Sequence, residues 1–191
     1  MLYTRKGDNG TTKTFGCDQK RISKASSVAE ALGALDEINS FLGLVKVKSA
    51  KSGYVHESEP FEKIVHNMQE SLFIIQAEVA GFEKDFPVSK ITEVETITDG
   101  IEKKLPPIKT FFISGGTELA SLFDISRTMA RRAERRVVQV NDEAVAAPDS
   151  GVKNIRSVTL SYLNRLSSLL YALARYSNHL AGIDEKPPEY K

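Results

Sequence analysis

The sequence predicts an all-α protein, because helical periodicity recurs in five segments and no sustained strand-like alternation is found. In each segment, apolar residues return every three to four positions. The connections between them are short and contain Gly, Pro and Ser. We therefore expect a five-helix bundle with ferritin-like up-down packing. A single domain over residues 1–191 is expected, with an N-terminal loop over 1–22, the helical bundle over 23–182 and a tail over 183–191.

The first helix is predicted from about Ser23 to Lys48 and the second from about Pro60 to Lys84, since both carry long apolar stripes. A shorter third helix from Val88 to Leu105 should end before Pro106, which cannot extend it comfortably. The fourth begins after a cap at Ser114 or Thr117 and runs to about Val140. After a surface connection over 141–153, the fifth runs from Ile155 to Tyr176.

Composition narrows the class of protein. The 191 residues are 41% hydrophobic and 27% charged, with a formal net charge of +1, which disfavours a general nucleic-acid or membrane-surface binder. Cys17 is the only cysteine, so no internal disulfide is possible and a cytoplasmic location is expected. No apolar run is long enough to cross a bilayer, and a glycine motif beginning at Thr4 leaves no room for a signal peptide.

The segment Ser126–Arg136 holds five arginines and one glutamate within a helical pattern. At about 100° per residue, Arg127, Arg131 and Glu134 share a stripe, with Arg135 beside it. Guanidinium groups bind phosphate in a bidentate way, so this face favours a small anionic ligand. The alternative is a solvated face with local ion pairs.

The N-terminal segment places Gly7 and Gly10 among Thr4, Asp8, Thr11 and Thr12. Its backbone can turn tightly and present amides and hydroxyls to phosphate oxygens, and Asp8 could assist a hydrated Mg²⁺. A plain flexible N-terminus is the alternative, because the spacing matches no standard nucleotide motif. Coincidence with the arginine helix favours the phosphate hypothesis.

The first helix carries a stripe of small and polar residues, namely Gly33, Asp36, Asn39, Ser40 and Gly43. Glycine within a helix suggests close approach of another backbone or a ligand, either in a tight intrachain crossing or at a subunit interface. Asp36 would need a partner if buried, and Arg127 is a candidate. The three histidines show no metal-ligand pairing, so no protein-ligated metal is expected.

In this order, the motifs Thr4–Gly10, Ala34–Ser40, Phe111–Gly116, Arg131–Arg135 and Asn164–Ser167 resemble the PduO-type ATP:cob(I)alamin adenosyltransferases, over nearly the whole chain. The resemblance implies a homotrimer with ATP sites between subunits. It also implies that Asp36 and Arg127 bridge adjacent subunits beside the corrinoid, and that Phe111 displaces the lower cobalt ligand; these three are the expected catalytic residues. The ATP-binding residues implied are Thr4, Arg5, Lys6, Gly7, Thr12, Lys13, Lys24, Arg131, Arg132, Glu134, Arg135 and Asn164.

The reaction implied is attack of Co(I) on the 5′ carbon of ATP, which gives adenosylcobalamin and triphosphate, with Mg²⁺ and the arginines stabilising the leaving polyanion. A cobalamin reductase and a cobalamin-dependent acceptor enzyme would be partners. A nucleotide-sensing bundle that transfers nothing is the alternative, and Phe111 distinguishes the two, since a sensor needs no apolar corrinoid wall. A nucleic-acid-binding helix is disfavoured by the near-zero net charge.

Overall fold

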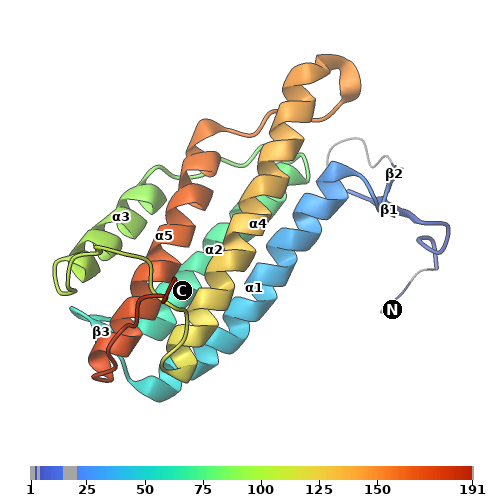
Figure 1. The fold of residues 1–191 in the computed structure, drawn as a ribbon. Coiled ribbons are helices and arrows are strands. Elements are labelled where there is room, and N and C mark those ends of the chain that lie inside the picture. The colour runs from blue at the N-terminus through green and yellow to red at the C-terminus, as the bar shows by residue number, and fades with distance from the viewer. Residues whose placement is uncertain (1–2, 4, 15–20, 191) are drawn as a thin grey trace.

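The computed structural model describes residue 3, residues 5–14 and residues 21–190, except for the side chain at position 150. Within these residues, five α-helices form an elongated bundle (Figure 1). They are α1 (Ser27–Ser52), α2 (Phe61–Val79), α3 (Ser89–Glu102), α4 (Glu118–Ala146) and α5 (Ser157–Leu180). The predicted all-α class and its five helices are confirmed, with ends that differ from the expected ones by a few residues.

Two short antiparallel strand pairs accompany the helices, although the sequence showed no strand pattern. Strand β1 (Thr11–Lys13) pairs with β2 (Arg21–Ser23), and β3 (Val55–His56) pairs with β4 (Glu59–Pro60). Strands of two or three residues are too short to show an alternating apolar pattern, so periodicity cannot identify them. The β1–β2 pair forms a hairpin in part of the segment that was expected to be an N-terminal loop. A short 3₁₀ helix, η1 (Pro148–Ser150), follows α4.

The core lies where the apolar stripes of the helices meet. Helix α1 packs against α2 and α4, and α5 packs against α4 and α3. Phe61 of α2 lies against Phe123 of α4 and Tyr176 of α5, with ring centroids 6.1 Å and 5.9 Å apart. These contacts fix α4 and α5 relative to each other, and most of the candidate site is built on these two helices. No helix among the described residues is both long enough and apolar enough to span a membrane.

The helix ends are capped by different means. Ser26 and Thr117 accept hydrogen bonds from Ala29 N–H and Ala120 N–H, at the starts of α1 and α4. Helix α5 has no cap from its own N-cap residue. Instead the buried Glu78 carboxylate of α2 accepts from Arg156 N–H at 2.9 Å and from the Thr159 hydroxyl at 2.5 Å.

Replacing Glu78 with Ala should lower the free energy of unfolding by about 2–3 kcal/mol, because it leaves buried donors at the start of α5 without an acceptor. Urea unfolding followed by circular dichroism would measure the change. Glu62→Ala, an exposed carboxylate on the same helix, is the control and should stay within about 0.5 kcal/mol. Equal effects of the two substitutions would contradict the capping role.

Candidate functional site

A groove of about 630 Å³ lies between the loop 103–117 and helices α4 and α5. Phe111 and Phe112 line it from the loop, Arg127 and Arg131 from α4, and Tyr171 from α5. The Phe111 side chain is 78% exposed, so its ring is available to a ligand and contributes little to the core. The groove therefore combines an exposed aromatic ring with two guanidinium groups, a combination suited to a ligand with both an apolar and an anionic part.

Arg127 lines the groove from α4 and lies close to Tyr171 of α5. Its guanidinium carbon lies 5.8 Å from the Tyr171 ring centroid, within range of a cation-π interaction. Its Nε is buried and has no hydrogen-bond acceptor among the described residues. A buried donor without a partner is costly, so an acceptor from a ligand, a water molecule or a neighbouring subunit would stabilise this side chain.

Asp124 lies one helical turn before Arg127. Its Oδ2 accepts a hydrogen bond from Gly115 N–H at 3.0 Å, which ties the start of α4 to the loop. Burial raises the pKa of the Asp124 carboxyl, and Glu185 raises it further, although the Gly115 N–H, Arg127 and Ser114 oppose the shift. Burial also raises the pKa of Tyr171. The partly buried Asp124 carboxylate is thus a net cost to the folded state when it is ionised.

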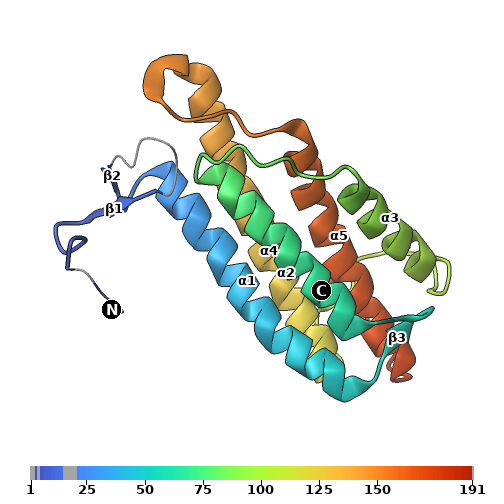
Figure 2. The same ribbon diagram turned by 180° about the vertical axis from the view of Figure 1, so that it is seen from behind.

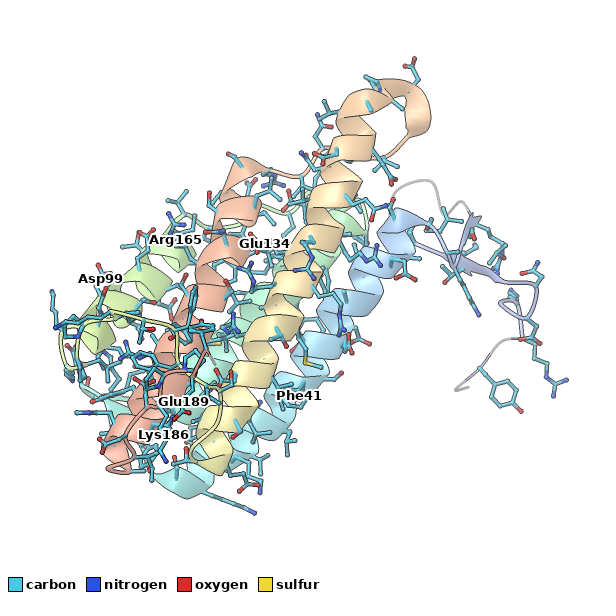
Figure 3. The ribbon with its side chains drawn as sticks, viewed as in Figure 1. Phe41, Asp99, Glu134, Arg165, Lys186 and Glu189 are labelled. Carbon is cyan, nitrogen blue, oxygen red and sulfur yellow. The ribbon has the colours of Figure 1, made fainter. Side chains whose placement is uncertain are left out.

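The free energy of unfolding of Asp124→Asn, measured relative to that of the wild type, should increase as the pH rises. Below the ordinary Asp pKa of 3.8 the carboxyl is protonated in both states. As pH rises through the elevated folded pKa, only the wild type pays for ionising a buried group. Urea unfolding from about pH 4 to about pH 7 measures this difference. Asp99→Asn, at an exposed position of α3 (Figure 3), should show no such trend, and a flat difference for Asp124→Asn would contradict the assignment.

The other arginines of α4 divide into paired and unpaired groups. Arg132 forms an ion pair with Glu37 of α1, and Arg136 lies 3.9 Å from Glu30. Arg131 and Arg135 have no hydrogen-bond or ion-pair partner in the described part of the chain, and both are exposed. The solvated-face alternative therefore accounts for Arg132 and Arg136, and leaves two cations available for an anion.

Glu134 and Asn164 are brought together from α4 and α5. The Asn164 amide donates to Glu134 Oε1 at 3.1 Å and accepts from Arg165, which also binds Glu95 of α3 at 2.9 Å. Figure 3 shows Glu134 and Arg165 on these neighbouring helices. This series of hydrogen bonds links α4, α5 and α3. It joins the predicted residues Glu134 and Asn164 directly by a hydrogen bond, beside the unpaired arginines of α4.

The N-terminal segment forms a tight, ordered turn beside the β1–β2 hairpin. Gly10 has a φ of +77°, which favours glycine, and its N–H donates to Gly7 O at 3.2 Å. Arg21 donates to the Thr11 hydroxyl at 2.7 Å and to Thr11 O at 2.9 Å. A Cβ at Gly7 would lie 3.2 Å from Thr11 O and 3.3 Å from Lys24 Nζ, so the Lys24 amine lies beside this turn.

This hairpin projects away from the bundle beside the start of α1, as both views show (Figures 1 and 2). Among the described residues, no hydrogen bond or ion pair joins Arg5, Lys6 or Thr12 to the arginines of α4. These residues of the hairpin are thus not joined to the arginine helix within the described part of one chain, and the ATP site implied by the resemblance lies between subunits. Thr4, also predicted to bind ATP, lies outside the described residues, as does Cys17.

Asp36 lies on the outer face of α1 and is exposed. It has no hydrogen-bond or ion-pair partner among the described residues, so a pair between Asp36 and Arg127 does not form within this chain. A Cβ at Gly33 would meet no other element within 4 Å, which excludes a tight intrachain crossing at that position. Asn39 of the same stripe is instead buried, and its backbone O accepts from Gln69 of α2 at 3.0 Å.

The sequence analysis missed several groups at the groove, among them Tyr171 on its wall and Asp124 beside Arg127. Tyr171 follows an apolar pattern in the sequence and could not be distinguished from a core residue. Asp124 lies one turn from the arginine cluster, and that spacing was a signal. Among the described residues, no group of three or more His, Cys, Asp or Glu could hold a metal ion.

The fold and groove define an all-α bundle with unpaired arginines and an exposed aromatic ring at an open site. The cobalamin adenosyltransferase family model matches residues 2–177. The chain therefore belongs to the cobalamin adenosyltransferase family, and it is of the PduO type.

Individual relatives agree with this assignment. The chain is 37% identical over 186 residues to the corrinoid adenosyltransferase PduO of Citrobacter freundii, covering 93% of this chain and 50% of that protein. It is 34% identical to the corrinoid adenosyltransferase of Bacillus subtilis over 189 residues, covering 96% and 90%. The chain thus spans about half the length of the Citrobacter PduO and nearly all of the Bacillus protein.

Solved structures share the fold. A variant of the PduO-type ATP:corrinoid adenosyltransferase from Lactobacillus reuteri, complexed with cobalamin and ATP, has a TM-score of 0.79 at 27% identity and covers 100% of this chain and 97% of its own. Another variant of that enzyme, complexed with ATP, has a TM-score of 0.81 at 28% identity, covering 98% and 100%.

Proposed function

We propose that this protein transfers the 5′-deoxyadenosyl group of ATP to cob(I)alamin, with Mg²⁺ accompanying the nucleotide. The observation that carries the proposal is the groove that brings the exposed Phe111 together with Arg127 and Arg131. A corrinoid offers a broad apolar face to an aromatic ring, and a triphosphate offers oxygens to free guanidinium groups. Family membership and the ligands of the Lactobacillus enzyme support the same substrates.

In the proposed reaction the cobalt of cob(I)alamin is the nucleophile. Its electron pair forms the bond to C5′ of ATP, while the C5′–O bond breaks and its electrons leave with the triphosphate. Arg131 and Arg135, helped by Arg132, bind and stabilise this leaving polyanion. Glu134 and Asn164 orient the nucleoside end of ATP. The protein needs no side-chain nucleophile.

Phe111 is proposed to cover the lower axial face of the corrinoid. An apolar ring at that face excludes water and the lower cobalt ligand, which makes four-coordinate Co(II) easier to reduce and protects Co(I) once it is formed. The exposure of Phe111 beside the groove fits this role, because a core phenylalanine could not contact a ligand.

The active oligomer is proposed to be a homotrimer with sites shared between subunits. Three features support sharing: the hairpin projects from the bundle, Arg127 Nε has no acceptor among the described residues, and Asp36 has no partner among them. A neighbouring subunit could supply Asp36 to Arg127 and an N-terminal turn, with Arg5, Lys6, Gly7, Thr12, Lys13 and Lys24, to the arginines of α4. Thr4 would belong to the same turn.

Anaerobic turnover tests the activity directly. Chemically reduced cob(I)alamin and Mg-ATP are mixed with the protein, the absorbance change to adenosylcobalamin is followed, and triphosphate is assayed. We expect both products in equal amounts. Tight ATP binding without adenosylcobalamin would instead favour a nucleotide sensor and overturn the proposed function.

Mixing two inactive variants tests site sharing. If the hairpin and the arginines of one site come from different subunits, unfolding and refolding Lys24→Ala with Arg131→Ala should restore activity at about one site in four. Each variant refolded alone is the control. No recovery in verified mixed oligomers would contradict the shared site.

Other parts of the proposal rest on sequence alone. A cytoplasmic location is proposed, because a single cysteine fits a reducing compartment. A cobalamin reductase would supply the Co(I) substrate, and a cobalamin-dependent enzyme would accept the product.

A further inference from the structure

The loop that carries Phe111 is held at its C-terminal end by Asn178 of α5. The Asn178 side chain is buried; its amide donates to Gly115 O at 2.7 Å, and its Oδ1 accepts from Thr117 N–H at 2.9 Å. One side chain thus satisfies both a carbonyl and an N–H of the same short segment. This pairing also fixes which end of the amide carries the oxygen.

Gly116 lies directly against this amide. Its φ is +106°, and a Cβ at this position would come within 2.4 Å of Asn178 Oδ1. Glycine is therefore required both by the backbone conformation and by the close approach. The glycine pair that stands out in the sequence serves to let Asn178 reach the backbone.

The start of the loop is held by Arg175, one turn earlier on α5. This buried guanidinium donates to Pro106 O at 3.2 Å, and its carbon lies 5.1 Å from the Phe112 ring centroid. Its Nε donates to both carboxylate oxygens of Glu185 in the tail, at 3.0 Å and 2.8 Å. The tail returns along the loop, where Ile113 N–H donates to Lys186 O at 2.9 Å; Figure 3 labels Lys186 at this place.

We propose that Asn178 and Arg175 are positioning residues that act through Phe111. Phe111 itself is exposed, and the hydrogen bonds that hold the loop come from residues on either side of it, at Pro106, Ile113 and Gly115. Both ends are anchored on the same turn of one rigid helix, whose inward face packs on the core. The inference rests on the proposed function of Phe111 at the corrinoid, and its structural part holds independently of it.

The test compares Asn178→Ala with Asn141→Ala. Asn141 is a matched control, because its Oδ1 also accepts from a backbone N–H, that of Ile155 at 3.0 Å, at the other end of α5. We expect Asn178→Ala to lower kcat by about ten- to a hundredfold, as displaced catalytic groups do, while KM for ATP changes less than about twofold. Asn141→Ala should keep the wild-type kcat. Asn178→Asp keeps the shape and the acceptor but loses the donor to Gly115, so it provides a second variant if alanine prevents folding.

Two further measurements separate positioning from a general loss of structure. In a Phe111→Ala background, Asn178→Ala should cost almost nothing more, because its effect passes through the missing ring. Hydrogen exchange of the amides in residues 111–117 should accelerate in Asn178→Ala and not in Asn141→Ala. Additive kinetic losses, or unchanged exchange in the loop, would overturn the proposal. A wild-type protein without transferase activity would refute the proposed function, while the exchange experiment would still decide whether Asn178 holds the loop.

Discussion

Replacing Arg131 with Ala is expected to lower kcat/KM for ATP by about a hundred- to a thousandfold, as the loss of one preorganised donor to a developing anion does. Arg131 lines the groove, is exposed and has no ion-pair partner among the described residues. Its charge is therefore available to a triphosphate without the loss of an intrachain contact. Steady-state kinetics with ATP as the varied substrate would measure the effect.

Arg136→Ala is the matched control for this substitution. Arg136 lies on the same helix and carries the same charge, but it contacts Gln139 at 3.1 Å and lies near Glu30. Both variants should unfold within about 0.5 kcal/mol of wild type, since both side chains are exposed. Comparable kinetic losses for the two would mean that α4 acts through its overall charge and would contradict a specific role for Arg131.

The helices could be predicted because their physical cause is local. Apolar residues at helical spacing must be buried together, and Thr117 and Pro106 mark boundaries through capping and through the missing N–H of proline. The arginine stripe followed from the same geometry, and the structure places Arg127 and Arg131 on one groove. What a single helix determines could be predicted from its own residues.

Contacts between distant segments could not be predicted in this way. Glu78 caps α5 from α2, 78 residues before Arg156 in the sequence, and Asn178 binds a loop 63 residues earlier than itself. In the sequence both look like ordinary polar residues at the edge of an apolar stripe. Their partners depend on how the helices pack, which periodicity does not specify.

Which charged residues form ion pairs also could not be predicted from the sequence. The sequence could not tell which arginines of α4 are neutralised within the chain, since that depends on Glu30 and Glu37 of α1 lying beside them. It also could not show that Asp36 is exposed without a partner among the described residues, or that the N-terminal hairpin projects from the bundle. That outward orientation is what now supports a shared site.

Replacing Phe111 with Ala should lower kcat by about a hundredfold, equivalent to about 2.7 kcal/mol of transition-state stabilisation. Without the ring, water can reach the lower axial face of the corrinoid, so the four-coordinate Co(II) state is less populated and Co(I) is formed more slowly. Because the side chain is 78% exposed, the melting temperature should be unchanged. Turnover starting from Co(II) with a reductant, together with electron paramagnetic resonance of bound cob(II)alamin, would measure both effects.

Ile113→Ala is the matched control, because Ile113 is a large exposed apolar residue of the same loop that does not line the groove. It should retain the wild-type kcat and the wild-type share of four-coordinate Co(II). Supplying chemically reduced Co(I) should restore part of the activity of Phe111→Ala, since the ring is then no longer needed for reduction. If Phe111→Ala instead keeps full turnover from Co(II), the ring does not exclude water from cobalt, and the groove must hold the corrinoid by other contacts.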